Sequence, residues 1–337
     1  MQVTIWFWVL FNVFILAMLA LDLGVFHRSA HAVSLREAAI WTAVWISLSL
    51  SFNLGIYLFA GTEPALAFLT GYMIEYALSV DNIFVMVLIF TYFRVEPMYQ
   101  HRVLFWGIIG ALIMRCIFIL VGTYLLQHFH WVIYLFGALL VFTGTRMAFR
   151  DEAPFDAESN RLLRLVRKLL PVTSQYHGKH FLVKQNGKLF ATPLLLVLVM
   201  VEFTDLIFAV DSIPAIFAVT TDSFLVYTSN VFAILGLRSL YFLLAGIVDQ
   251  FRYLKYGLSF ILVFVGVKML LSEIQKVPIV ASLVVIATAL LISILLSLIV
   301  PEPEDEDDED EMDERVLPPA KETRPAAMVR EKIRQVE

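Results

Sequence analysis

Long apolar segments dominate this chain and leave it few folds to choose from. Of its 337 residues, 60% are hydrophobic and only 16% are charged. Nine segments are long and apolar enough to cross the roughly 30 Å of a bilayer's hydrocarbon core. They cover residues 5–26, 38–60, 65–92, 103–127, 131–149, 193–219, 224–248, 255–271 and 278–300. Because lipid offers no hydrogen bonds to the backbone, each segment should be a helix, which predicts an all-α polytopic membrane protein with about nine transmembrane helices.

The charges of the connecting loops predict the orientation of these spans. Loops one, three, five and seven carry Lys or Arg, for example Arg28, Arg94 and Lys255, whereas loops two, four and six carry neither. Basic loops stay cytoplasmic, so we expect the N-terminus outside and the C-terminus in the cytoplasm. Lys276 in the eighth loop departs from the pattern. The first segment lacks a basic flank and a small-residue cleavage site, so we interpret it as a retained span.

Two of the segments carry the same acidic motif. The third reads Glu75-Tyr-Ala-Leu-Ser-Val-Asp81-Asn82, and the sixth reads Asp205-Leu-Ile-Phe-Ala-Val-Asp211-Ser212, with Glu202 one turn earlier. A charged side chain at the membrane centre costs about 2.5–3.5 kcal/mol on insertion scales, and such residues are functional by default. A salt-bridge network that only specifies helix packing is the alternative, but Ser, Thr and small residues provide packing contacts at lower cost. The motifs therefore favour one ion or proton site built from two halves.

The two motifs lie in repeats of opposite topology. The copies are three spans apart, so spans three to five begin at the outer face and spans six to eight at the inner face. A second match pairs residues 141–147 in span five with residues 263–269 in span eight. Looser matches pair Gly110 with Gly236 and Arg115 with Arg238. Inverted repeats with a polar site near the midplane are typical of secondary transporters, and we predict a 3+3 inverted repeat here.

The repeat divides the chain into six parts. These are two N-terminal helices (1–62), the first repeat (63–149), a cytoplasmic linker (150–191), the second repeat (192–272), a C-terminal helix (277–300) and an acidic tail (301–337). In the linker we predict a basic amphipathic helix over 159–170 and a β-hairpin with an Asn-Gly turn over 181–190. His177 and His180 beside the hairpin are interpreted as solvated, because no third metal ligand is evident. Eleven acids between residues 302 and 314 predict a disordered, solvated tail.

Helical spacing determines which polar residues share a face. Two matching stripes result, one of Glu75, Ser79 and Asn82 and the other of Asp205, Ala209 and Ser212. Asp81 and Asp211 fall about 120° off these stripes in an ideal helix. Either the site is wide or at least one of the two helices is broken where the acids lie. Pro214 favours a break in the sixth segment, which would free backbone carbonyls as further ligands.

The candidate metal ligands offer oxygen atoms only. They are Glu75, Asp81, Asn82, Glu202, Asp205, Asp211 and Ser212. Oxygen donors suit Mg²⁺, Ca²⁺ and Mn²⁺, and the choice among these ions stays open. We expect Arg115 and Arg238 to be buried counter-charges of the acids. Asn53 and Asn230 fit either this site or interhelical hydrogen bonds.

At these motifs the sequence resembles the TerC family of integral membrane proteins, within the LysE-type transporter superfamily, and especially its Alx branch. The resemblance rests on residues 67–82, 101–111, 191–222 and 230–244 and extends from about residue 20 to 300. It implies Mn²⁺ export across a bacterial inner membrane, with the acids named above as metal ligands, and a historical label of tellurium resistance. Tellurite is an anion, however, and a site of net negative charge would repel it.

We therefore expect a multi-pass transporter and not an enzyme, with Mn²⁺ as the transported ion and no permanently bound cofactor. Its expected partners are the lipid bilayer, the divalent cation and protons, without nucleic acid. Acids outnumber the buried arginines, which favours cation/proton exchange. The alternative is a non-transporting scaffold that assists assembly or metal loading of exported proteins, a role credited to some members of the family. A redox or hydrolytic enzyme is disfavoured because the chain has one cysteine, Cys116, and no membrane histidine or cofactor motif.

Overall fold

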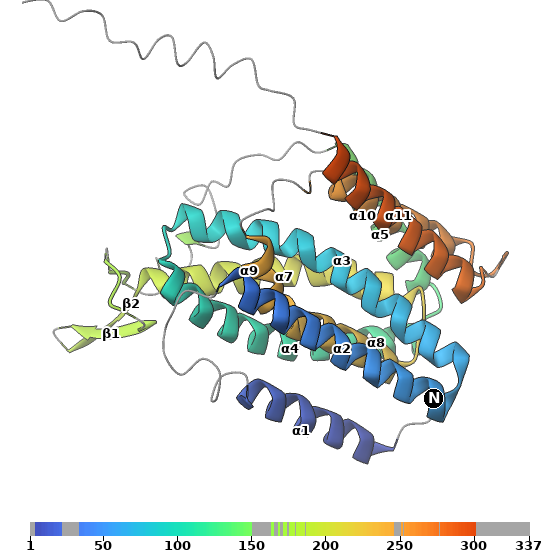
Figure 1. Ribbon diagram of the computed structural model, residues 1–337, viewed down its shortest axis with the longest axis horizontal. Coiled ribbons are helices and arrows are strands. Elements are labelled where there is room, and N and C mark those ends of the chain that lie inside the picture. The colour runs from blue at the N-terminus through green and yellow to red at the C-terminus, as the bar shows by residue number, and fades with distance from the viewer. Residues whose placement is uncertain are drawn as a thin grey trace, which may run out of the picture. The chain divides into compact units, whose positions relative to one another are not determined.

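The structure is a computed structural model that describes residues 4–21, 34–149, 163–164, 168, 171–173, 175–178, 180–185, 187–245, 251, 253–275 and 277–300. The named helices are α1 (Ile5–Leu21), α2 (Leu35–Ala60), α3 (Thr62–Tyr92), α4 (Pro97–His128), α5 (Val132–Phe149), α7 (Pro193–Phe217), α8 (Ser223–Leu235), α9 (Leu237–Leu244), α10 (Leu254–Leu270) and α11 (Ile279–Ile299). Two strands, β1 (Leu182–Gln185) and β2 (Lys188–Ala191), lie between α5 and α7 (Figure 1).

Each predicted apolar segment overlaps one of these helices or, in the seventh, the pair α8 and α9. Within the described ranges, six helices are long and apolar enough to cross a membrane: α2, α3, α4, α5, α7 and α11. The pair α8–α9, bent by 40°, makes a seventh if it is one span. Helices α1 and α10 have 17 residues each, the lower limit for a spanning helix. The chain is thus an all-helical integral membrane protein with one small hairpin.

Helix ends follow local sequence signals. Ser34 caps α2 by accepting a hydrogen bond from the Glu37 amide at 3.3 Å. Gly61 follows α2 with φ 93°, a left-handed conformation that lets the chain turn at once into α3. Pro97 opens α4, and Asp222 caps α8 through the amides of Phe224 and Leu225. These signals set the lengths of the helices that carry the polar residues.

Helix α3 lies at the centre of the helix packing, in contact with α2, α7, α8, α9 and α11 (Figure 1). Helices α4 and α7 also pack on each other and α4 packs on α8. Every residue of α8 from Phe224 to Leu235 is buried, so this helix is enclosed by its neighbours. Helix α5 packs closely on α10, which in turn contacts α11. The polar stripes of α3 and α7 therefore face other helices and not the exterior.

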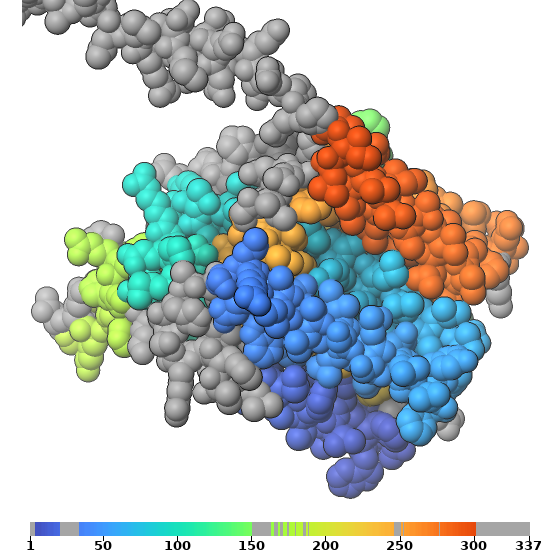
Figure 2. Space-filling model, in the orientation of Figure 1, coloured from blue at the N-terminus to red at the C-terminus, as the bar shows by residue number. Residues whose placement is uncertain are grey.

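The outer surfaces of the helices are apolar, as a lipid-facing surface requires. On the face shown in Figure 2, α1, α2 and α11 form much of the surface. Exposed side chains on these helices include Trp6, Leu58, Phe59, Leu291 and Leu298. Buried polar residues, by contrast, include the whole stripe of Glu75, Ser79 and Asn82 on α3. The exposed surface is thus more apolar than that of a water-soluble protein, whereas the interior contains both apolar and polar side chains.

The predicted hairpin is present. Strands β1 and β2 are antiparallel with Gln185 opposite Lys188, and Gly187 in the two-residue connection has φ 78°. Tyr176 ties this region to the end of α3, because its hydroxyl donates to the Phe93 carbonyl at 2.6 Å. Burial, with a smaller effect of the Glu96 carboxylate, raises the pKa of Tyr176, so the hydroxyl stays protonated as a donor. Most of the predicted amphipathic helix over 159–170, and the acidic tail over 301–337, lie outside the described residues.

Candidate ion site

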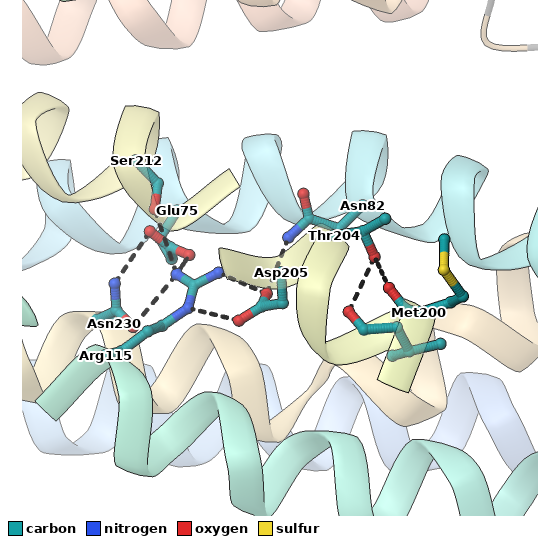
Figure 3. A network of polar contacts seen from close by, with 9 residues as sticks. Glu75, Asn82, Arg115, Met200, Thr204, Asp205, Ser212 and Asn230 are labelled. Atoms are coloured by element: carbon teal, nitrogen blue, oxygen red, sulfur yellow. Dashed lines mark hydrogen bonds and ion pairs between the residues drawn. The ribbon is translucent and has the colours of Figure 1, made fainter. Parts of the chain in front are cut away.

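The site is organised by Arg115, a buried arginine on α4 with a relative exposure of 1%. Its Nη1 donates to the carboxylate of Glu75 on α3, which is also fully buried. Its Nη2 donates to Oδ1 of Asp205 on α7 at 2.9 Å, and its Nε lies 3.4 Å from Oδ2 of the same carboxylate. One guanidinium thus joins the first acids of the two sequence motifs (Figure 3).

Amide and hydroxyl groups complete this cluster. Asn230 on α8 donates to Oε2 of Glu75 at 3.1 Å, and its Oδ1 lies 3.4 Å from Nη1 of Arg115. The Ser212 hydroxyl lies 3.3 Å from the same nitrogen, and Asn82 donates to Asp205 at 3.5 Å. These side chains come from four helices, α3, α4, α7 and α8, and converge on one guanidinium (Figure 3). We name the six residues the Arg115 cluster: Glu75, Asn82, Arg115, Asp205, Ser212 and Asn230.

The cluster carries two carboxylates against one guanidinium, and all three groups are buried. A buried ion pair loses hydration on both partners, and removing one partner leaves a charge that nothing balances. The formal charge of −1 is therefore the main electrostatic property of this site. A cation held by both Glu75 and Asp205 would have to displace Arg115 from at least one of them, because the guanidinium bridges the two carboxylates.

The predicted stripes are confirmed, because Glu75, Ser79 and Asn82 are all buried on α3, as are Asp205, Ala209 and Ser212 on α7. The other three predicted acids, Asp81, Glu202 and Asp211, are only partly buried and belong to other sides of the two helices. Asp211 faces Thr143 of α5. Glu202 lies against Gly110 of α4, where an added Cβ would overlap its carboxylate. The structure therefore brings together four of the seven candidate ligands.

The predicted helix break at the acids is wrong. Helix α3 is continuous from Thr62 to Tyr92, and α7 is continuous from Pro193 to Phe217. Pro214 is accommodated because it stands in the last turn, so a kink there ends the helix instead of interrupting it. Asp81, Glu202 and Asp211 lie off the stripes and face other sides of these continuous helices. The break lies in the seventh segment, where α8 and α9 meet at Gly236 with a bend of 40°.

Arg238 follows this break and is buried, as predicted, with a relative exposure of 6%. Its Nη1 lies 3.1 Å from Nε2 of His101 on α4, a contact that the sequence did not reveal. Arg238 and Asp205 also line one small cavity between α3, α4, α7 and α9. Lys268 is a further partly buried cation that sequence reasoning missed, and it donates to Ser282 of α11 at 2.8 Å. Lys268 stands in the last turn of the largely apolar α10, and its partial burial was not predicted from that pattern.

Two oxygens have no hydrogen-bond partner among the described residues: Oδ1 of Asn82 in the cluster and Oγ of Ser79 on the same stripe. They lie one turn apart on the buried stripe of α3, and both are acceptors that a hard cation would use. The Thr204 hydroxyl, by contrast, donates to the carbonyls of Met200 and Val201 on its own helix. No group of three or more His, Cys, Asp or Glu side chains close enough to hold a metal occurs within the described part of the chain. Besides the Glu75 and Asp205 carboxylates, the oxygens in the cluster belong to the side chains of Asn82, Ser212 and Asn230.

Of the two asparagines left open by the sequence, Asn230 joins the cluster. Asn53 on α2 does not, and its Oδ1 has no partner among the described residues. The difference reflects helix position, because α8 packs directly on α3 at the level of Glu75.

Comparison with known proteins places this chain among bacterial membrane proteins. An uncharacterized membrane protein of Myxococcus xanthus is 54% identical over 292 residues, which cover 87% of this chain and 92% of the relative. Proteins of Salmonella typhi and of Escherichia coli K12, each named "Putative membrane-bound redox modulator Alx", are 49% and 48% identical over 299 residues, 86% of this chain and 93% of theirs. No solved structure matches the chain. The sequence pattern described as "Integral membrane protein TerC family" matches residues 60–305, and the chain belongs to this family.

Proposed function

We propose that this protein is a transporter of the bacterial inner membrane that exports a divalent cation, Mn²⁺ before Ca²⁺ or Mg²⁺, in exchange for protons. The observation that carries the proposal is the Arg115 cluster, in which Glu75 of α3 and Asp205 of α7 meet deep inside the helices. Acids so placed are costly to keep in a membrane protein and usually mark an ion or proton path. The cluster's other groups offer oxygen atoms, which suit these three ions.

Contacts between α3 and α7 support the predicted inverted repeat. In the sequence match, Glu75 corresponds to Asp205 and Asn82 to Ser212. Asn82 donates to Asp205, while Ser212 and Glu75 meet at Nη1 of Arg115. Exchanging each residue for its counterpart relates the direct Asn82–Asp205 pair to the Ser212–Glu75 pair, which meets through Arg115. A pseudo-two-fold axis in the membrane plane, as in inverted repeats of transporters, would relate two helices in this way.

Helices α5 and α10 repeat the relation independently. Gly144 corresponds to Gly266 in the sequence match, and Gly137 therefore corresponds to Ser259. Ser259 donates to the Gly144 carbonyl at 2.6 Å. A Cβ added at Gly266 would lie 2.7 Å from the Gly137 carbonyl oxygen. Both pairs are close backbone approaches between antiparallel helices, so we propose nine spans with repeats over α3–α5 and α7–α10.

In the proposed cycle Arg115 and the cation compete for the same carboxylates. Mn²⁺ entering from the cytoplasm would take oxygens of Glu75, Asp205, Asn82 and Ser212, and the guanidinium would move off the carboxylates. When the ion leaves, Arg115 returns or protons neutralise the acids, which avoids bare buried charge. Asp81, Glu202 and Asp211, which are partly buried on the same two helices, would line the approach to the site.

The test is Mn²⁺ efflux from preloaded cells that express wild type, Glu75→Gln, Asp205→Asn, Asp81→Asn or Asp211→Asn. We expect loss of efflux in the first two variants and reduced efflux in the last two. Collapsing the proton gradient should stop efflux by wild type. Equal efflux in all five proteins would remove these acids from the mechanism, and efflux without a gradient would remove proton exchange.

A non-transporting scaffold for exported proteins is the alternative, and purified protein in liposomes separates the two. A transporter moves Mn²⁺ across the vesicle membrane without other proteins, whereas a scaffold does not. Protein with Glu75→Gln in the same vesicles controls for leakage. We propose transport and not enzymatic activity, because ion passage explains why two acids are buried around one arginine.

A further inference from the structure

The two repeat-related arginines have different surroundings in the structure. Arg115 on α4 contacts both Glu75 and Asp205. Arg238 on α9 contacts His101 and stands on the wall of the small cavity that Asp205 also lines. Helix α4 runs unbroken past Arg115, whereas the α8–α9 break falls two residues before Arg238. The bend therefore separates two arginines that a symmetric repeat would place alike.

The cavity occupies the place where the first repeat lacks a match to Asn230. Asn230 stands eight residues before Arg238, and Gly107 stands eight residues before Arg115. Asn230 donates to Glu75, while Gly107 has no side chain and lines the cavity beside Asp205. The free volume of about 10 Å³ is enough for one water molecule. Its walls otherwise come from apolar residues such as Ala111.

We infer that Arg238 is a second counter-charge for Asp205, which takes this carboxylate across the cavity when Arg115 releases it. The inference rests on the proposed function, since cation binding is what displaces Arg115. Asp205 needs a cationic partner whenever it is charged and buried. In the resting state that partner is Arg115, and with the ion bound it is the ion. Between release of the ion and the return of Arg115, the partner is Arg238. Arg238 is thus a positioning residue whose effect passes through Asp205.

A double-mutant cycle between Arg115→Gln and Arg238→Gln tests this, with the melting temperature of purified protein in detergent as readout. Arg115 contacts Glu75 and Asp205, whereas Arg238 contacts His101, and effects of separate sites normally add. If Arg238 rescues Asp205 when Arg115 is absent, the double variant will lose several degrees more than the sum of the single losses. The same cycle in an Asp205→Asn background should give additive losses, because the shared carboxylate is gone.

Three further variants serve as a substitute and as controls in this test. Should Arg115→Gln fail to fold, Arg115→Lys replaces it, because lysine keeps the charge but loses the two-pronged contact with Asp205. Ala111→Leu fills the cavity between Asp205 and Arg238 and should abolish the excess loss, whereas Ala138→Leu on the exposed side of α5 should preserve it.

Additive losses in the native background, or an excess loss that persists in Asp205→Asn or Ala111→Leu, would overturn the second counter-charge. That result would leave Mn²⁺ transport intact, since the readout is thermal stability. An excess loss that depends on Asp205, together with absent Mn²⁺ flux in liposomes, would keep the counter-charge and overturn the transport proposal.

Discussion

At the scale of single residues, Asn230 shows how closely the Arg115 cluster depends on one amide. Asn230→Ala removes the donor to Oε2 of Glu75 and leaves a buried carboxylate oxygen unpaired. We expect a loss of about 1–3 kcal/mol in stability, the usual cost of an unsatisfied buried group. Asn53→Ala is the matched control, because the Asn53 oxygen has no partner among the described residues. Thermal melts of the two variants in one detergent compare them, and equal losses would contradict the role assigned to Asn230.

A second residue-scale prediction concerns Gly110. A Cβ at this position would overlap the carboxylate of Glu202, so Gly110→Ala must turn that side chain away from α4. We expect a loss of about 1–3 kcal/mol, as for overpacking of a tight interface. Gly55→Ala on α2 has open space around its Cβ and should be neutral or stabilising, since alanine favours a helix. Melting temperatures that fall equally in both variants would argue against a specific contact with Glu202.

At the scale of elements, α5 and α10 approach closely because both present small residues at their crossing. A Cβ at Gly266 would lie 2.7 Å from the Gly137 carbonyl and 2.9 Å from the Val141 amide. Gly266→Ala should push the helices apart and reduce stability by about 1–3 kcal/mol. The neighbouring Val267 is exposed, so Val267→Leu should change little. Detergent melting curves test the pair, and a tolerated Gly266→Ala would show that the helices can separate freely.

At the scale of the whole molecule, the loop charges predict a definite orientation. Lys184 on the hairpin and His130 between α4 and α5 are both exposed and belong to loops predicted to lie on opposite sides. In a Cys116→Ser background, a cysteine at position 184 should react with an impermeant maleimide only from the cytoplasm. A cysteine at position 130 should react only from outside. Labelling of position 184 only from outside and of position 130 only from the cytoplasm would reverse the proposed topology. Labelling of both from the same side would show that α5 does not cross the membrane.

The sequence alone predicted the apolar segments and the helix faces on which the acids lie. Each predicted segment overlaps a helix or the bent pair, because lipid leaves the backbone no other way to satisfy its hydrogen bonds. The stripe of Glu75, Ser79 and Asn82 followed from helical spacing, which is a local property. The hairpin was predicted from an Asn-Gly turn between short apolar runs. The inverted repeat and the metal ligands remain predictions from the same sequence.

Tertiary packing decided which of these residues meet. The choice of Arg115 over Arg238 as partner of Asp205 depends on the rotation of α4 and on the bend at Gly236. The sequence predicted a helix break at Pro214 because proline is a strong local helix breaker. The bend occurs instead at Gly236, which packs against Trp45 of α2 and Tyr76 of α3. Contacts such as Asn230 with Glu75 join positions 155 residues apart. Spacing along one helix determines its faces, but only the packing of several helices determines what each face touches.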